Sequence, residues 1–217
     1  MKILFVTPYY KPSIGGVQQY VESLVEAYKD EHEVVVVTTA LSSAQPAHEI
    51  VDGVSIYRLP VLFTLANTPY HPRWKTMFKV IYRTEQPDVI NAHGPVPWFA
   101  DIAERANKAR YPFVLTYHAG SMKKGSLAPD LLIGAYERHV LPKTLRSASR
   151  LVAVYPDFLR RILGNSRELK HITPGIDIER FKPEQTVKQH DLLFVGRLEQ
   201  SSAWKGVTVA IETIAEL

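Results

Sequence analysis

The chain of 217 residues contains no cysteine, which excludes a disulfide framework and any zinc site with cysteine ligands. No stretch approaches the roughly 18 consecutive apolar residues of a membrane-spanning helix, and the apolar run at Ile3–Thr7 is too short for a secretory signal peptide. Positive charge is not gathered into a block, because 26 Lys and Arg are interspersed with 22 Asp and Glu. We therefore expect a cytoplasmic protein with no nucleic-acid partner.

Short apolar runs alternate with segments of helical periodicity along most of the chain. After Gly15 and Gly16, for example, Val17, Val21 and Val25 recur at helical spacing between two runs rich in β-branched residues. Such alternation predicts an α/β fold with a doubly wound parallel sheet, as in Rossmann-like domains. The expected strands cover 3–7, 34–38, 54–59, 89–92, 113–117, 151–154 and 171–173, the later expected helices cover 74–83, 98–109, 131–145 and 157–163, and loops are expected at 40–50 and 60–72.

Changes of pattern divide the chain into three parts. A first domain is expected over 1–180, and the polar, aperiodic segment 181–190 is expected to be a linker. Residues 191–217 combine an apolar run, a Gly-Arg turn and a helical pattern, which predicts the first strand, at 192–195, and the first helix of a truncated second domain. One strand and one helix bury too little apolar surface to be stable alone. We therefore expect self-association through 191–217.

Two adjacent glycines, Gly15 and Gly16, lie between the first expected strand and the first expected helix. Without side chains there, a ligand can approach the backbone closely, and the free N–H groups of a helix N-terminus can hold an anion. A tight turn that requires a positive φ is the alternative explanation. The pattern is not G-x-G-x-x-G, so a dinucleotide cofactor is not expected.

Five segments place Gly, Pro, His or basic residues at the ends of expected strands. They are P-x-x-x-P-x-x-GG-V-x-x-Y at 8–20, PDVINAHGP at 87–95, PFVLTYHAG at 112–120, ITPGIDIERFKP at 172–183 and VGRLEQSSAWKG at 195–206. In this order they resemble the motifs of the retaining GT-B glycosyltransferase family 4, which includes enzymes of the phosphatidylinositol mannosyltransferase type. The resemblance covers the first domain and the opening of the second.

The resemblance implies transfer of a sugar from a nucleoside diphosphate sugar to a hydroxyl acceptor, either a glycan, a lipid or a small molecule. The backbone of Gly15 and Gly16 would contact the donor, and Arg197 and Lys205 would bind its diphosphate. Cations there stabilise the negative charge that the leaving group gains in the transition state. A solvated surface position is the alternative for both cations. The sequence contains no Asp-x-Asp motif, so we expect neither a metal ion nor another cofactor.

On the acceptor side, the resemblance assigns His118 to the catalytic position beside the transferred sugar. Tyr9, Gln18, His93 and Lys123 are expected to bind the acceptor. From the residues alone, His118 can also be a hydrogen-bonded structural histidine. His93 either lines the same crevice or caps its strand, and the sequence does not decide between these two positions.

The segment RWKTMFKVIYR at 73–83 reads as a basic amphipathic helix that contains tryptophan. Such a helix can lie on an anionic membrane, which would make the protein peripherally membrane-associated and suit a lipid-linked acceptor. It can equally cover a sheet with its apolar side and expose its Lys and Arg to water. Both interpretations stay open.

Two further functions stay open as alternatives to a glycosyltransferase. One is a GT-B epimerase or phosphorylase, which shares the architecture. The other is a non-catalytic binding subunit that works with a separate second half.

Because the nucleoside-binding part of the second domain is missing, we expect the 217-residue chain alone to be inactive as a transferase and to bind free nucleotides negligibly. Calorimetric titration with UDP, GDP and ADP measures this. A dissociation constant near 1 μM, about −8 kcal/mol of binding free energy, would show that the donor site is misplaced.

Overall fold

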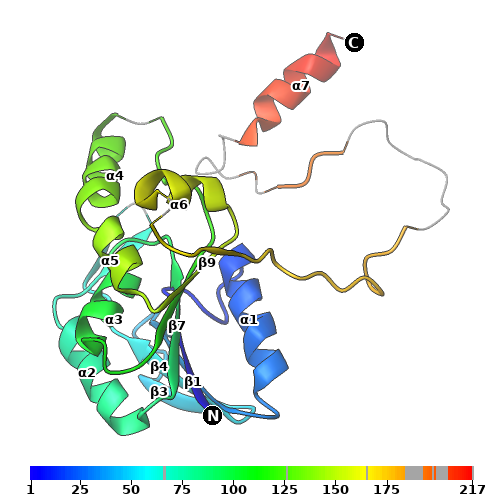
Figure 1. Cartoon of the computed structure of the whole chain (residues 1–217). Helices are drawn as coiled ribbons and strands as arrows, with labels where there is room; N and C mark the ends of the chain where they lie inside the picture. The colour runs from blue at the N-terminus through cyan, green and yellow to red at the C-terminus, as the bar shows by residue number, and fades with distance from the viewer. Residues whose placement is uncertain are drawn as a thin grey trace. The chain divides into compact units, whose positions relative to one another are not determined.

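The computed structural model describes residues 1–65, 67–125, 127–164, 166–183, 193–196, 198 and 205–216. The chain divides into two compact units, Met1–Pro174 and Gly175–Leu217, each of which is described by itself. The first unit holds the sheet and its helices, and the second contains the helix α7, Val207–Ala215 (Figure 1).

The first unit is built on one large sheet. Its strands are β1 Lys2–Val6, β2 Glu33–Thr39, β3 His48–Val51, β4 Val54–Leu59, β7 Val89–Gly94, β8 Phe113–Tyr117, β9 Arg150–Ala153 and β10 Lys170–His171. They lie in the order β10-β9-β8-β7-β1-β2-β4-β3, and all neighbours are parallel except β3, which pairs antiparallel with β4. The predicted α/β fold is confirmed, and each strand predicted in this unit is present.

Helices cover both faces of this sheet (Figure 1). They are α1 Gly16–Tyr28, α2 Trp74–Glu85, α3 Phe99–Asn107, α4 Leu127–His139, α5 Leu141–Ser147 and α6 Pro156–Leu163. Successive side chains of a strand point to opposite faces. Accordingly, Ile3 and Phe5 of β1 share a core with Val21 of α1, whereas Leu4 belongs to a larger core with residues of α2, α3, α5 and α6.

The apolar side of α2 faces the core. Trp74 and Phe78 are fully buried and Ile81 is nearly so, while Lys75 and Arg83 are exposed. This arrangement agrees with a helix that covers the sheet rather than one that offers its tryptophan to a membrane. Among the described residues, no helix is both long and apolar enough to cross a membrane.

Two segments that were predicted as loops contain strands. Within 40–50, the largely exposed β3 pairs with β4 at the edge of the sheet, and within 60–72 the strands β5, Phe63–Leu65, and β6, Thr68–Tyr70, form a separate hairpin. An edge strand carries little apolar periodicity, so β3 looks polar in the sequence. Each strand of a lone hairpin has a free edge, where the missing N–H of a proline such as Pro69 is tolerated.

The single helix predicted over 131–145 was wrong, because α4 and α5 are separate helices that meet at Val140. Pro142 lacks an N–H, and its ring would clash with the carbonyl group of Arg138 in a continuous helix. In the second unit, the expected strand at 192–195 does not form over its described residues, 193–195. A strand needs a neighbour for its hydrogen bonds, and the described residues of this unit supply none.

A buried carboxylate joins three helices near the carboxyl ends of the strands. Asp101 of α3 is 1% exposed and accepts hydrogen bonds from the Trp98 N–H at 2.9 Å, from the Tyr136 hydroxyl of α4 at 2.8 Å and from the Thr144 hydroxyl of α5. The next residue of α4, Glu137, accepts hydrogen bonds from the loop that follows β8. The Asp101 network therefore fixes the helix that holds this loop.

We expect Asp101→Ala to lower the free energy of unfolding by about 3 kcal/mol, because it leaves buried hydroxyl donors without an acceptor. Tyr136→Phe removes one donor and leaves the carboxylate two others, so its expected cost is about 1 kcal/mol. Urea unfolding of the two single variants and of the double variant measures both losses of unfolding free energy and the coupling energy between the two residues. Equal losses for the two single variants would contradict a shared network.

Candidate functional site

The direction of chain winding reverses at β1. The chain runs from β1 to β2 and β4 on one side and then continues on the other side of β1 with β7, β8 and β9. In an open parallel sheet, ligands bind beyond the carboxyl ends of the strands at such a switch point. The loops after β1, β7 and β8 meet there, and they carry most of the site residues predicted from the sequence.

The Gly15–Gly16 loop follows β1 and opens α1. Neither glycine lies in the left-handed region, since Gly15 is extended with φ 178° and Gly16 has no positive φ, so the tight-turn explanation was wrong. A Cβ at Gly15 would lie 2.5 Å from Oε1 of Gln18, so a larger residue there would displace the end of the Gln18 side chain. No side chain in the described ranges caps this helix, which leaves its first N–H groups for an anion.

Two histidines meet at the ends of β7 and β8. Nδ1 of His93 lies 2.9 Å from Nε2 of His118, and the two rings stack with their centroids 5.2 Å apart. His93 is 1% exposed and lies beneath His118, which is partly exposed. The described residues include no group of three or more His, Asp or Glu side chains placed to hold a metal ion. The 2.9 Å separation places the two imidazoles within hydrogen-bonding distance of each other.

The surroundings of His93 determine which nitrogen of each ring carries the proton. Nε2 of His93 is buried and has no hydrogen-bond partner among the described residues. A proton on that atom would be a buried donor without an acceptor, which costs more than a lone pair without a donor. The favoured arrangement places the proton on Nδ1 of His93, which then donates to Nε2 of His118. The proton of His118 must in turn lie on Nδ1.

Burial keeps both rings neutral. It lowers the pKa of His118 from its ordinary 6.5 to about 4. Burial also lowers the pKa of His93 well below 6.5, and the neighbouring His118 lowers it further. A neutral His118 whose Nε2 already accepts a hydrogen bond offers a ligand one polar group, the Nδ1–H donor.

Tyr20 is a site residue that the sequence reasoning missed. Its ring packs edge-on against His118, with centroids 4.7 Å apart, and also contacts His93 at 5.9 Å. Tyr20 lies four residues after Gly16, so the two share one side of α1, and the contact brings the opening turn of α1 toward His118. The signal was present in the sequence, because Tyr20 occupies the last position of the GG-V-x-x-Y pattern.

The other residues predicted to bind the acceptor lie around the pair of histidines. Tyr9 is half-buried on the β2 side, and its hydroxyl donates to the backbone carbonyl group of Asn67 at 2.8 Å. Gln18 donates to the Ser13 hydroxyl at 3.2 Å and so braces the glycine loop. Lys123 is exposed and lies against α4, with Nζ 3.1 Å from the position that a Cβ at residue 134 would take.

The predicted diphosphate cations belong to the second unit. Arg197 lies outside the described residues. Lys205 is exposed, and its Cδ lies 3.4 Å from the position that a Cβ on Gly196 would take, so its stem lies close to Gly196. Their roles in donor binding remain predictions.

We expect the neutral histidine pair to make the protein sensitive to acid. The unfolded chain takes up protons near pH 6.5, whereas folded His118 does so only near pH 4. The contribution of these histidines to the free energy of unfolding is therefore largest above pH 6.5. It is lost between pH 6.5 and 4, by up to about 1.4 kcal/mol per pH unit for each histidine. Urea unfolding at a series of pH values measures this slope. His118→Gln should reduce this slope, and the same change at an exposed position, His139→Gln, is the control; a slope in His118→Gln no smaller than that in His139→Gln would contradict the account.

Comparison with known proteins agrees with this architecture. Over 228 residues the chain is 25% identical to the phosphatidyl-myo-inositol mannosyltransferase of Mycolicibacterium smegmatis (strain ATCC 700084 / mc(2)155), an alignment that covers 100% of this chain and 55% of the relative. The chain thus spans about half the length of the curated relative that it matches.

Solved structures show the same fold. A sucrose-phosphate synthase from Thermosynechococcus elongatus superposes with a TM-score of 0.61 at 18% identity, over 84% of this chain and 50% of that one. A structure described as trehalose-6-phosphate from E. coli bound with UDP-2-fluoro glucose gives a TM-score of 0.53 at 9% identity, over 83% and 50% of the two chains. Finally, residues 14–180 match the sequence profile of Glycosyltransferase Family 4. This match covers the glycine loop and both histidines, and the chain belongs to Glycosyltransferase Family 4.

Proposed function

We propose that the protein containing this chain is a retaining glycosyltransferase that moves a sugar from a nucleoside diphosphate sugar to a hydroxyl acceptor. The observation that carries the proposal is the pairing of an uncapped, glycine-opened helix with a neutral His118 at the switch point of a family 4 domain. The chain supplies the acceptor half of the site. The donor's nucleoside, and the contacts of Arg197 and Lys205 with its diphosphate, belong to the second half.

The glycine loop suits the donor's sugar phosphate. Gly16 leaves open space where a side chain would stand, and the first N–H groups of α1 carry the positive end of the helix dipole. As the bond between the anomeric carbon and the diphosphate breaks, negative charge grows on the leaving oxygen. Hydrogen-bond donors that are fixed in place before the reaction stabilise that charge, because they need not reorganise as it develops.

His118 acts in this proposal as a hydrogen-bond donor and not as a base. A base whose pKa is about 4 removes a proton from an alcohol poorly at neutral pH, and its Nε2 lone pair is already engaged by His93. The Nδ1–H of His118 can instead hold a hydroxyl of the transferred sugar in a fixed orientation. This orientation lowers the activation barrier, because the sugar has already lost its freedom of motion on binding and need not lose it at the transition state.

Because His118 does not act as the base, the proton of the acceptor hydroxyl must pass to another group. In the front-face mechanism that is proposed for the family, the acceptor oxygen attacks the anomeric carbon on the face from which the diphosphate leaves. The new carbon–oxygen bond forms as the old one breaks, and the acceptor proton passes to a diphosphate oxygen. This route needs no protein carboxylate pair and keeps the configuration at the anomeric carbon.

His93 is a positioning residue in this scheme. It is buried from solvent, but its Nδ1–H donates to Nε2 of His118 and thereby sets the tautomer of the His118 imidazole. The predicted acceptor-binding role of His93 is thus exerted through His118.

The transfer assay uses the complete natural polypeptide that contains this chain. UDP-, GDP- and ADP-sugars are tested with glycan, lipid and small-molecule acceptors, and the product is identified by mass. Failure to release nucleoside diphosphate and to form a glycoside with any combination would overturn the proposal.

In the active combination, we expect His118→Ala to lower kcat about 100- to 1,000-fold with little change in donor affinity. Lys205→Ala should lower kcat/KM by the equivalent of about 2–4 kcal/mol. His93→Leu should approach the loss of His118→Ala, whereas His93→Asn keeps an N–H donor near the position of Nδ1 and should recover much of the rate. The exposed His139→Gln is the control. Near-normal turnover of His118→Ala would leave His118 a structural histidine.

A further inference from the structure

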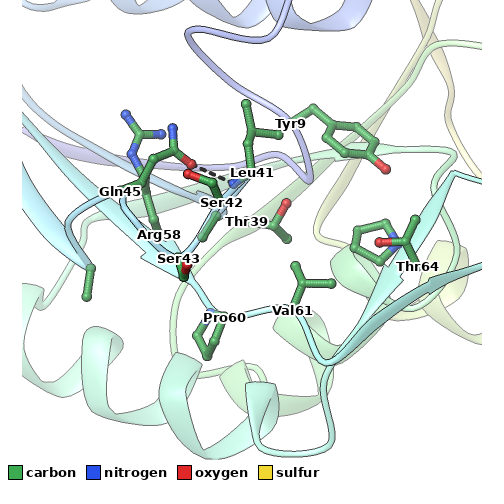
Figure 2. Close-up of a pocket in the computed structure, with 13 residues that line it drawn as sticks. Tyr9, Thr39, Leu41, Ser42, Ser43, Gln45, Arg58, Pro60, Val61 and Thr64 are labelled. Carbon is green, nitrogen blue, oxygen red and sulfur yellow. Dashed lines mark hydrogen bonds between the residues drawn. The ribbon is translucent and has the colours of Figure 1, made fainter.

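A concavity opens at the same edge of the sheet, on the β2 side of β1. Its volume is about 530 Å³, within the range of roughly 300–1,000 Å³ that small-molecule sites occupy. The loops after β2 and β4 form its floor, and the β5–β6 hairpin forms one wall. Figure 2 shows Tyr9 and Thr64 on one side of it and Gln45 and Arg58 on the other.

The lining offers uncharged hydrogen-bonding groups next to apolar surface. Oε1 of Gln45 accepts the backbone N–H of Leu41, which leaves its amide N–H groups for a ligand. The hydroxyls of Ser42, Ser43 and Thr64 also have no partner among the described residues. Between these polar groups lie the aliphatic side chains of Pro60 and Val61. Such a mixture suits a ligand with both hydroxyl groups and C–H faces.

Among the described residues of the lining, Arg58 is the one that carries a charge, and this charge is already neutralised. Its Nη2 forms an ion pair with Glu49 at 2.5 Å, and its Nη1 donates to the backbone carbonyl group of Lys11 at 3.0 Å. Its Nε has no hydrogen-bond partner in the described part of the chain, but that atom is buried where a ligand could not reach it. An anionic ligand would therefore lose hydration in the pocket and gain no counter-charge there.

Tyr9 closes the wall of the pocket. Its hydroxyl donates to the backbone carbonyl group of Asn67, in the turn of the hairpin, and this bond joins the β1 loop to the β5–β6 hairpin. Burial raises the pKa of the Tyr9 hydroxyl, so it stays a protonated donor at neutral pH. The same loop continues to Gly15 and Gly16, which links the pocket to the proposed reaction centre by a short stretch of backbone.

From these observations we infer that the pocket is a subsite for an uncharged saccharide unit of the acceptor. The inference rests on the proposed function, since it assigns the acceptor of that reaction to the neutral carbohydrate class. A phosphorylated acceptor head group finds no partner in this lining. Such a group would have to bind elsewhere, for example near Lys123.

The direct test is NMR titration of the 15N-labelled 217-residue chain with glucose, maltose and glucose 6-phosphate. We expect glucose and maltose to shift the backbone amides of Thr39, Leu41, Gln45 and Thr64, with maltose binding at least several-fold more tightly than glucose. Glucose 6-phosphate should bind no more tightly than glucose. Shifts confined to other residues, no shift with either neutral sugar, or tighter binding of the phosphate would each overturn the inference.

Substitutions at Thr64 sharpen the test, because this side chain is exposed and its replacement does not disturb a core. Thr64→Val should weaken maltose binding several-fold, whereas Thr76→Val, the same change at an exposed position on α2, should leave it unchanged. Thr64→Lys should reverse the preference, so that glucose 6-phosphate binds more tightly than glucose. Equal effects of Thr64→Val and Thr76→Val would count against the subsite.

The outcome is separable from that of the transfer assay. A protein that binds neutral sugars at these amides but transfers nothing would refute the proposed function and retain the subsite. A protein that transfers sugar while neutral sugars leave these amides unshifted would support the proposed function and refute the subsite.

Discussion

The pairing of β1 with both β2 and β7 is the constraint on which the rest of the structure depends. Because the chain extends from β1 first in one direction and then in the other, the helices that follow β1 and β7 lie over opposite faces of the sheet. The carboxyl ends of these strands are therefore open to a ligand. The glycine loop and the histidine pair owe their proximity to this topology and not to their distance in the sequence.

Burial then gives the histidine pair its chemistry. An imidazole in water is half protonated near pH 6.5, whereas the desolvated pair stays neutral through the physiological range. Since the described residues offer Nε2 of His93 no acceptor, only one direction of the hydrogen bond between the rings avoids a buried N–H without a partner. A site made in this way offers a neutral, oriented donor, which suits the binding of a sugar hydroxyl better than the removal of a proton.

Sequence reasoning predicted the parts of this protein that depend on local pattern. Alternating strands and helices, the glycine loop and the position of His118 at a strand end follow from periodicity and motif. The contact of His93 with His118 does not, since it arises from the parallel register of β7 and β8, which aligns Gly94 with Tyr117. The pocket that we propose as a saccharide subsite could not be predicted from the sequence, because β3 and the β5–β6 hairpin have the composition of loops and acquire their structure by pairing.

The tautomer of His118 tests the central claim most directly. Nitrogen-15 NMR of the imidazoles at neutral pH distinguishes a protonated nitrogen from one with a free lone pair, and selective loss of signals in His93→Asn and His118→Gln assigns the two rings. The account predicts that both histidines are neutral and that each carries its proton on Nδ1. A proton on Nε2 of His118, or a charged imidazolium on either ring, would contradict it.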